Sequence, residues 1–298
     1  MTDLVIRPLV AGEENLFDSM PNPLPQLRQV GYADGIAGGG YRPETTWVAL
    51  RGGRVVGRAA WLLPPGAVGA PWLDRFDLDA EPEVGAELLH AAHEALGGPG
   101  RYYAALPAHW RRREEVLAVV RAPMAAARLA GLVERGERLR CSWTGTPLPA
   151  SSGRYHFRPP ADAAEINALV SRIAEPDVLT GAEIAQAVAG VDLATDPLAW
   201  LGDATEEWRV ALHAGEPVGL VGTAGDACYP LLAYLGLLDE AARPELLAEA
   251  VRVLAAGGAR EVIADVDAHR VAVLAELERT GFRQLRSRVV FAPSDAPQ

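Results

Sequence analysis

Short apolar runs separated by glycine turns recur along the chain, between longer stretches with a helical spacing of apolar residues. Val48–Leu50 and Val55–Val56 flank the pair Gly52-Gly53, which predicts a strand, a tight turn and a second strand. In the second half the same reasoning predicts strands near 155–159, 206–213, 217–224, 228–238, 261–266 and 284–291, and helices near 162–174, 181–189, 243–256 and 269–280.

The strand-turn-strand segment occurs twice. Val48–Gly57 matches Val210–Gly219 at six of ten positions. Four such matches follow one another in the same order, at offsets of 151, 162, 158 and 150 residues, which indicates an internal duplication. The other three pair 5–8 with 156–159, 87–92 with 245–250, and 128–132 with 278–282. The order of elements in each copy predicts an α/β (α+β) unit, a mixed twisted sheet with helices on both faces.

The length of 298 residues suits two domains. We expect an N-terminal domain at 1–145, a linker at 146–153 and a C-terminal domain at 154–298, because the stretch around the linker is rich in Thr, Pro, Ser and Gly. The apolar terminal strands Leu139–Trp143 and Val289–Phe291 would leave exposed sheet edges. We therefore expect them to help form the contact between the domains.

The net charge of −11 argues against a nucleic-acid partner and favours a cationic small molecule. The sequence contains no lysine, which excludes a Walker A lysine and a Schiff base. No apolar stretch approaches the roughly 20 residues of a membrane span, and the first residues do not resemble an export signal. We expect a cytoplasmic monomer or homodimer with no membrane partner.

Cysteine and histidine give little support for a metal site. Cys141 and Cys228 lie far apart and are expected to be packing residues. His90 and His93 have a spacing that can hold a metal, but without a third ligand they favour an ordinary surface helix. No metal is expected.

Three segments of the second half, Tyr234–Leu238, Glu261–Asp267 and Leu277–Phe282, resemble the GNAT family of acyl-CoA-dependent N-acetyltransferases. The resemblance implies that acyl-CoA enters a gap between the fourth and fifth strands, with its pyrophosphate at the start of the next helix. It assigns cofactor contacts to Gly236, Leu237, Leu238 and Arg243 in the second half, and to Gly85 and Ala86 in the first.

Both copies depart from the family pattern. Neither keeps the glycine signature at the helix start, and Ala127 and Leu277 stand where the family has a proton-donating tyrosine. If only one copy binds CoA, Arg243 favours the second.

Acids at strand ends are the natural proton acceptors for such a transfer. In the second half the catalytic candidates are Tyr234, Asp265, Asp267 and His269. Each has an ordinary alternative: core packing for the tyrosine, a solvated strand end or helix cap for the aspartates, and a surface position for the histidine.

The first half offers substrate-binding candidates. Asp77 and Asp79 share one face of a strand and suit a cationic ligand or a solvated edge. Tyr32, Tyr41 and Trp47 are candidates for the wall of a substrate cleft.

The leading hypothesis is an N-acyltransferase that uses acetyl-CoA or another acyl-CoA to modify the amine of a small, cationic metabolite. The alternative is a noncatalytic GNAT-fold protein that binds a small ligand or a partner without acyl transfer.

Overall fold

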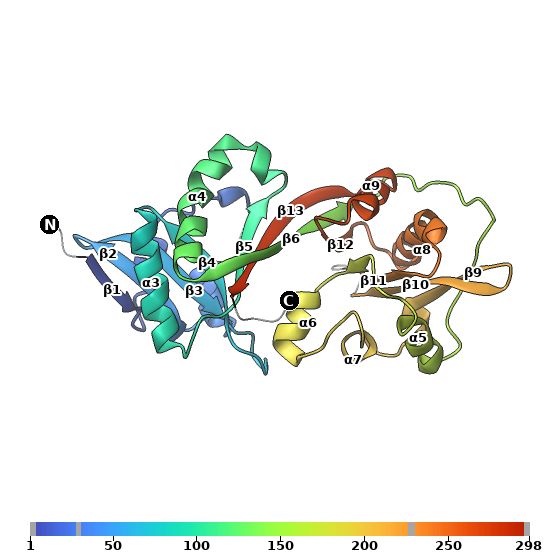
Figure 1. Cartoon of the computed structure of the whole chain (residues 1–298), viewed down its shortest axis with the longest axis horizontal. Helices are drawn as coiled ribbons and strands as arrows, with labels where there is room; N and C mark the ends of the chain where they lie inside the picture. Colours follow the sequence, from blue (N-terminus) through green and yellow to red (C-terminus); the bar gives the residue numbers. More distant parts are fainter. Residues whose placement is uncertain (1–3, 28–30, 226–229, 295–298) are drawn as a thin grey trace. The chain divides into compact units, whose positions relative to one another are not determined.

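The structure is a computed structural model that describes residues 4–27, 31–225 and 230–294. The chain forms two compact units, Met1–Glu137 with Arg286–Gln298, and Arg138–Leu285. Each unit is a mixed sheet with helices on both faces, as predicted (Figure 1). No helix of the described residues is long and apolar enough to cross a membrane.

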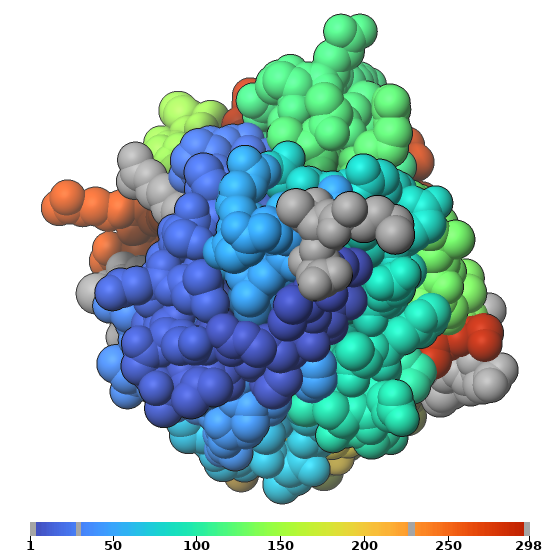
Figure 2. All heavy atoms as spheres, turned by 90° about the vertical axis from the view of Figure 1, so that its left-hand side faces the viewer, coloured from blue at the N-terminus to red at the C-terminus, as the bar shows by residue number. Residues whose placement is uncertain are grey.

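In the first unit the strands lie in the order β1-β2-β3-β4-β5-β13, with β4 and β5 parallel and the other neighbours antiparallel. Their bounds are β1 Leu4–Pro8, β2 Thr46–Arg51, β3 Arg54–Leu62, β4 Trp72–Leu78, β5 Tyr102–Pro107 and β13 Arg283–Pro293. Helices α3 (Pro82–Ala95) and α4 (Glu114–Leu129) bury their apolar faces in the larger core. The short helices α1 (Glu14–Asp18) and α2 (Tyr32–Ala37) pack in a second core with β2 and β3. In Figure 2, α3 (cyan) lies beside β1 (dark blue).

In the second unit the order is β6-β12-β11-β10-β9-β7, with β11 and β12 parallel. Their bounds are β6 Leu132–Trp143, β7 His156–Arg158, β9 Trp208–His213, β10 Glu216–Ala224, β11 Leu231–Leu237 and β12 Val262–Asp267. Helix α8 (Arg243–Ala256) and α9 (Val271–Arg279) pack in one core, and α5 (Ala163–Val170) with α7 (Leu198–Leu201) in another. Helix α6 spans Ala182–Ala189. The sequence analysis missed α7 and the two-residue strand β8 (Val178–Leu179), which pairs with β11.

The two units share details of backbone geometry that support the duplication. Val56 is an extra residue in β3 opposite β2, and Val218 is the extra residue in the equivalent strand β10. A second bulge adds Asp74 to β4 and Ala233 to β11. Bulges change the local twist and the direction of side chains, so their repetition at matching positions is a specific sign of common ancestry within the chain.

The last strand of each repeat completes the sheet that is built mainly from the other repeat. Residues 138–143 of β6 pair with β12, and residues 286–291 of β13 pair with β5. Both edges that the apolar terminal strands would expose are thereby paired. The compact units therefore begin and end at different residues from the sequence repeats, because each unit includes the last strand of the other repeat.

Two side chains test the expectations for cysteine and histidine. Cys141 is buried, as expected of a packing residue, whereas Cys228 lies outside the described residues. The surface position expected for His93 is wrong. Its ring is 6% exposed and packs edge-on against Trp61, and burial lowers its pKa to about 4.

The pairing of β13 with β5 predicts a large stability effect near the end of the chain. Phe291 is fully buried and stacks on Tyr102, with ring centroids 5.5 Å apart. Phe291→Ala should lower the free energy of unfolding by about 3–5 kcal/mol, whereas Leu285→Ala, at an exposed position of the same strand, should cost under about 0.5 kcal/mol. Urea unfolding measures both, and equal effects would contradict the assignment of β13 to the first core.

The ion pair between Arg158 and Glu165 predicts how the stability of the fold depends on pH. Arg158 binds Glu165 through two hydrogen bonds of 2.9 and 2.6 Å, and this contact lowers the pKa of Glu165 to about 2. The pair therefore stabilises the fold above the ordinary carboxyl pKa, and its contribution disappears as the pH falls towards 2. The melting temperatures of the wild type and Arg158→Gln should differ at pH 6 and converge near pH 2. A difference that persists at pH 2 would count against this linkage.

Candidate functional site

Each unit contains one pair of parallel strands that separates along its length. Among the described residues, β4 pairs with β5 at Leu73 and Tyr102 alone, and β11 pairs with β12 at Leu231 and Ile263 alone. A gap at the carboxyl ends of parallel strands is a common place for a ligand in α/β proteins. The two units differ in what lies in this gap.

In the first unit the gap between β4 and β5 is a recess that opens to solvent and has a cavity volume of about 50 Å³. Asn22 and Leu24 line one side of it, and α4 lines another. Its apolar wall contains Phe76, Tyr102, Leu106, Val120, Pro123 and Met124. An apolar wall of this kind suits the acyl group of an acyl thioester.

Charged side chains of β4 line the same recess. The bulged residue Asp74 accepts a short hydrogen bond from the hydroxyl of Tyr41. Burial, followed by the charge of Asp74, raises the pKa of Tyr41, so this tyrosine stays protonated and donates. Burial, followed by the charges of Asp77 and Asp74, also raises the pKa of Tyr102, and all three residues line the recess.

Asp77 is held by a buried arginine. Arg58 Nε donates to Asp77 Oδ2 over 2.7 Å, and Arg58 Nη1 donates to the carbonyl oxygens of Phe17 and Met20 over 2.8 and 2.7 Å. This arginine therefore fixes the segment before the recess against β3. Arg75, two residues before Asp77, also lines the recess and is only 6% exposed.

In the second unit a segment of the chain itself fills the gap. The backbone N–H of Asp177 donates to Leu235 O over 2.7 Å, and that of Thr180 donates to Ala233 O over 2.9 Å. On the other side, Thr180 Oγ1 accepts a hydrogen bond of 2.9 Å from the N–H of Asp265. Residues 177–180 thus bridge β11 and β12 where those strands separate.

The carboxylate of Asp177 lies between two arginines. Arg243 Nε at the start of α8 donates to Asp177 Oδ2 over 2.6 Å, and Arg270 Nη2 donates to Asp177 Oδ1 over 2.5 Å. The Asp177 side chain is 5% exposed. Arg243, to which the resemblance assigns a phosphate contact, is therefore paired with a carboxylate of its own chain.

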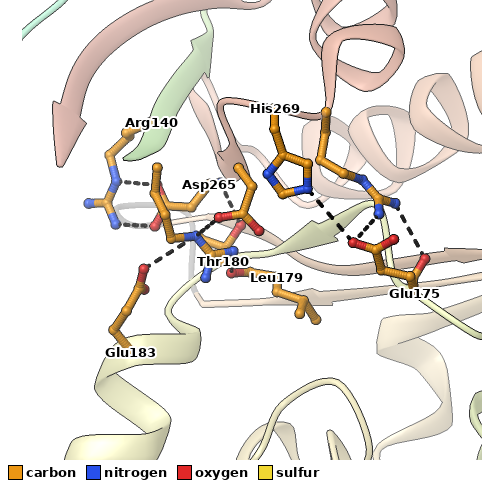
Figure 3. A network of polar contacts seen from close by, with 10 residues as sticks. Arg140, Glu175, Leu179, Thr180, Glu183, Asp265 and His269 are labelled. Atoms are coloured by element: carbon orange, nitrogen blue, oxygen red, sulfur yellow. Dashed lines mark hydrogen bonds and ion pairs between the residues drawn. The ribbon is translucent and has the colours of Figure 1, made fainter. Parts of the chain in front are cut away.

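Asp265 and Asp267 face arginines across the strand pair β6–β12. Arg140 binds Asp265 through two hydrogen bonds of 2.7 and 2.6 Å, and Figure 3 shows these two side chains pointing at each other. Arg138 Nε lies 3.5 Å from Asp267 and 3.2 Å from Glu183, and Arg138 Nη2 donates to Leu179 O. The sequence analysis did not foresee these pairs, because both arginines lie on the last strand of the first repeat.

The other catalytic candidates of the second unit lie apart from this network. Tyr234 is fully buried against Trp208, with ring centroids 5.7 Å apart, and burial raises its pKa. The His269 side chain is 72% exposed, and its Nε2 lies 3.9 Å from Glu175 (Figure 3). The structure does not bring Tyr234, Asp265 and His269 together around one cavity.

The remaining predicted residues occupy several environments. Tyr32 is buried and stacks on Phe17 and Tyr41, and Trp47 belongs to the larger core. Asp79 pairs with Arg54 at the surface. Of the five predicted substrate-binding residues, Asp77 lines the recess, and Tyr41 donates a hydrogen bond to Asp74, which also lines it.

Packing explains the glycines near the predicted cofactor loops. A Cβ on Gly85 would lie 2.7 Å from Ala126 Cβ, and one on Gly236 would lie 2.6 Å from Ile173 Cδ1. Ala86 is buried in α3 beside Gly85, and Leu237 and Leu238 are partly buried against the two cores of the second unit. Gly85 and Gly236 therefore have a structural role in close contacts between elements.

The matching bulges allow the two units to be compared residue by residue. Arg75 pairs with Ala60 in β3, and Tyr234 pairs with Gly222 at the same distance from the bulge. By this register Asp74, Arg75 and Asp77 of β4 correspond to Ala233, Tyr234 and Gly236 of β11. Of these two sets of corresponding residues, only the set that lines the open recess is charged. Among the described residues, no cluster of three or more His, Cys, Asp or Glu side chains has the geometry of a metal site.

The buried position of Asp177 predicts a strong effect on the second unit. Asp177→Asn removes the charge that Arg243 and Arg270 share and leaves both guanidinium groups without their main partner, which should cost about 3–5 kcal/mol of unfolding free energy. Asp196→Asn, at an exposed position, should change it by under about 0.5 kcal/mol. Denaturant unfolding and amide exchange of residues 177–180 give the measurement, and matching values for the two variants would refute the role assigned to Asp177.

No protein-family model matches the chain, and no curated protein matches it. Among solved structures it is similar to a GCN5-related N-acetyltransferase from Sphaerobacter thermophilus, with a TM-score of 0.58, 13% identity and coverage of 97% of this chain and 94% of that one. A conserved Staphylococcus epidermidis protein of unknown function has a TM-score of 0.51 and 14% identity, with coverage of 80% and 91%. A tandem GNAT protein from the clavulanic acid biosynthesis pathway has a TM-score of 0.43 and 19% identity, with coverage of 99% and 100%. The likeness to the Sphaerobacter thermophilus structure shows the fold of the GCN5-related N-acetyltransferases, and the two units with their matching bulges show that the chain carries it in two tandem copies.

Proposed function

We propose that the protein is an acyl-CoA-dependent N-acyltransferase that modifies the amine of a small molecule, and that the acyl-CoA binds in the recess of the first unit. The observation that carries the proposal is the open, partly apolar recess between the separated strands β4 and β5. It lies in a fold shared with a GCN5-related N-acetyltransferase.

The first unit is a better candidate than the second, which the sequence favoured because of Arg243. In the second unit residues 177–180 fill the gap, and Arg243 forms an ion pair with Asp177. A ligand would have to displace several hydrogen bonds and a buried ion pair there. We therefore assign a noncatalytic role to the second unit.

The residues around the recess fit one end of acyl-CoA better than the other. The apolar wall suits the acyl group. The following helix α3 begins at Pro82, which has no N–H, and the Val84 N–H donates to Glu81 O, so this helix start has few backbone donors for an anion. Asp79 and Glu81 lie nearby, but their carboxylates pair with Arg54 and Arg51. Phosphate groups would compete with these carboxylates for the two arginines.

Asp74 is the proposed proton acceptor. Bound acyl-CoA would supply an activated acyl group as a thioester. As the amine nitrogen bonds to the acyl carbon, the C–S bond of the thioester breaks, the amine loses a proton and CoA leaves as the thiol. The Asp74 carboxylate lines the recess where such an amine would enter and can accept that proton. Tyr41 holds this carboxylate in place through its hydroxyl. Tyr102, kept protonated by its raised pKa, can donate a hydrogen bond to a developing oxyanion.

The acidic start of α3 favours a second candidate, a GNAT-fold protein that binds a small ligand without acyl transfer. Asp79, Glu81 and Glu83 would oppose bound phosphates in the absence of Arg51 and Arg54. The two candidates differ in one observable, since only the enzyme releases free CoA when an amine is added.

Calorimetric titration with acetyl-CoA tests the proposal. Ala105→Trp places an indole in the recess and should weaken acetyl-CoA binding at least about tenfold, because the added ring takes the volume of the ligand. Ala95→Trp, the same change at an exposed position of α3, should bind like the wild type. Melting curves confirm that both variants fold.

Two results would contradict the proposal. Absence of acetyl-CoA binding to the wild type at millimolar concentration would exclude the donor. Equal binding by the two tryptophan variants would exclude the recess as its site. Binding without release of free thiol across a panel of primary amines would favour the noncatalytic candidate.

A further inference from the structure

Arg75 is a buried cation that has no partner among the residues that the structure describes. The residue is 6% exposed and lines the recess of the first unit. Its Nε has no hydrogen-bond partner, and among the residues that the structure describes its side chain forms no ion pair and no ring contact. An arginine stays protonated in proteins, so its charge is present whether or not it is compensated. Burial of an uncompensated charge costs free energy.

Arg58 shows what a compensated arginine looks like in the same part of the sheet. It is 2% exposed and pairs with Asp77, while Ala60, two residues further along β3, is the partner of Arg75. Arg58 binds one carboxylate and two carbonyl oxygens. The two arginines therefore have similar burial and neighbouring positions, but only Arg58 has partners.

The surroundings of Arg75 combine both signs of charge. The Tyr41 hydroxyl donates to Asp74, which precedes Arg75 in β4, and Asp74 and Arg75 both line the recess. A cation and a carboxylate are thus available to one ligand in the same cavity.

We propose that Arg75 binds a carboxylate of the substrate, and that the acceptor is an amino-acid-like molecule whose amine approaches Asp74 while its carboxylate pairs with Arg75. This inference rests on the proposed function for the identity of the reaction. The planar guanidinium matches a carboxylate through two parallel hydrogen bonds, which gives orientation as well as affinity. The second unit has Tyr234 at the corresponding position, so it lacks this recognition element.

The first test measures stability without any ligand. Arg75→Met removes a buried charge that has no partner and should leave the melting temperature unchanged or raise it. Arg58→Met removes a charge with three partners and should lower the melting temperature clearly. A loss for Arg75→Met as large as that for Arg58→Met would show that Arg75 is a structural residue, which would overturn the proposal.

The second test measures binding to the full-length protein by calorimetry. The probes are the proteinogenic amino acids, each compared with its carboxamide, which keeps the amine and removes the negative charge. At least one amino acid should bind the wild type about tenfold more tightly than its carboxamide, and Arg75→Met should abolish that difference. Absence of any such preference in the wild type, or its persistence in Arg75→Met, would overturn the proposal.

A third test distinguishes the two possible sources of the carboxylate, which are the acceptor and the acyl group of the donor. Succinyl-CoA carries a carboxylate on its acyl group and acetyl-CoA does not. Equal effects of Arg75→Met on the two donors support the acceptor as the source. A selective loss of succinyl-CoA binding would overturn the amino-acid acceptor and assign the carboxylate to the acyl group.

The outcomes for the reaction and for Arg75 can be separated. Failure of acetyl-CoA to bind removes the proposed function, while the comparison of amino acids with carboxamides still reports on Arg75 because it needs no donor. Normal acetyl-CoA binding together with no carboxylate preference removes only the inference about Arg75.

Discussion

The separation of the one parallel strand pair in each sheet is the constraint on which the rest of the site depends. Where β4 leaves β5 and β11 leaves β12, the facing backbone edges lose their strand partners. Unpaired backbone groups are costly when they are buried, so something must bind there. In the second unit residues 177–180 supply those hydrogen bonds from within the chain. In the first unit a recess remains, and a substrate can meet the same requirement.

The duplication explains how one chain contains both a gap that is filled by its own backbone and a gap that stays open. The repeated bulges show that the two sheets have kept the same backbone geometry around the gap. The side chains there have diverged, with Asp74 and Arg75 in one copy and Ala233 and Tyr234 in the other. In the filled gap the charge lies on the inserted segment, where Asp177 pairs with Arg243 and Arg270, whereas in the open recess it lies on β4 itself. Backbone geometry and side-chain chemistry have therefore changed independently.

Sequence reasoning predicted the duplicated α/β fold and most elements because these depend on local apolar periodicity. It failed where partners are distant. The pairing of Arg140 with Asp265 joins residues 125 positions apart, and nothing local to Asp265 indicates it. The strand β8 is two residues long and carries no periodic signal. Asp74 lies three residues before Asp77, so regular strand alternation would turn the two side chains to opposite faces. The bulge at Asp74 interrupts the alternation of β4, and both residues line the recess.

The use of arginine for every basic position bears on how net charge should be interpreted. All 28 basic residues are arginines, and the excess of acids gives −11 overall. Many of these arginines form two-point contacts with carboxylates, as Arg7 does with Glu13 and Arg140 with Asp265. Acids paired in this way are not available to attract a cationic ligand, so the overall charge says little about the recess. The local balance there is set by Asp74 and Arg75, and it favours a ligand that carries both signs of charge over a simple cation.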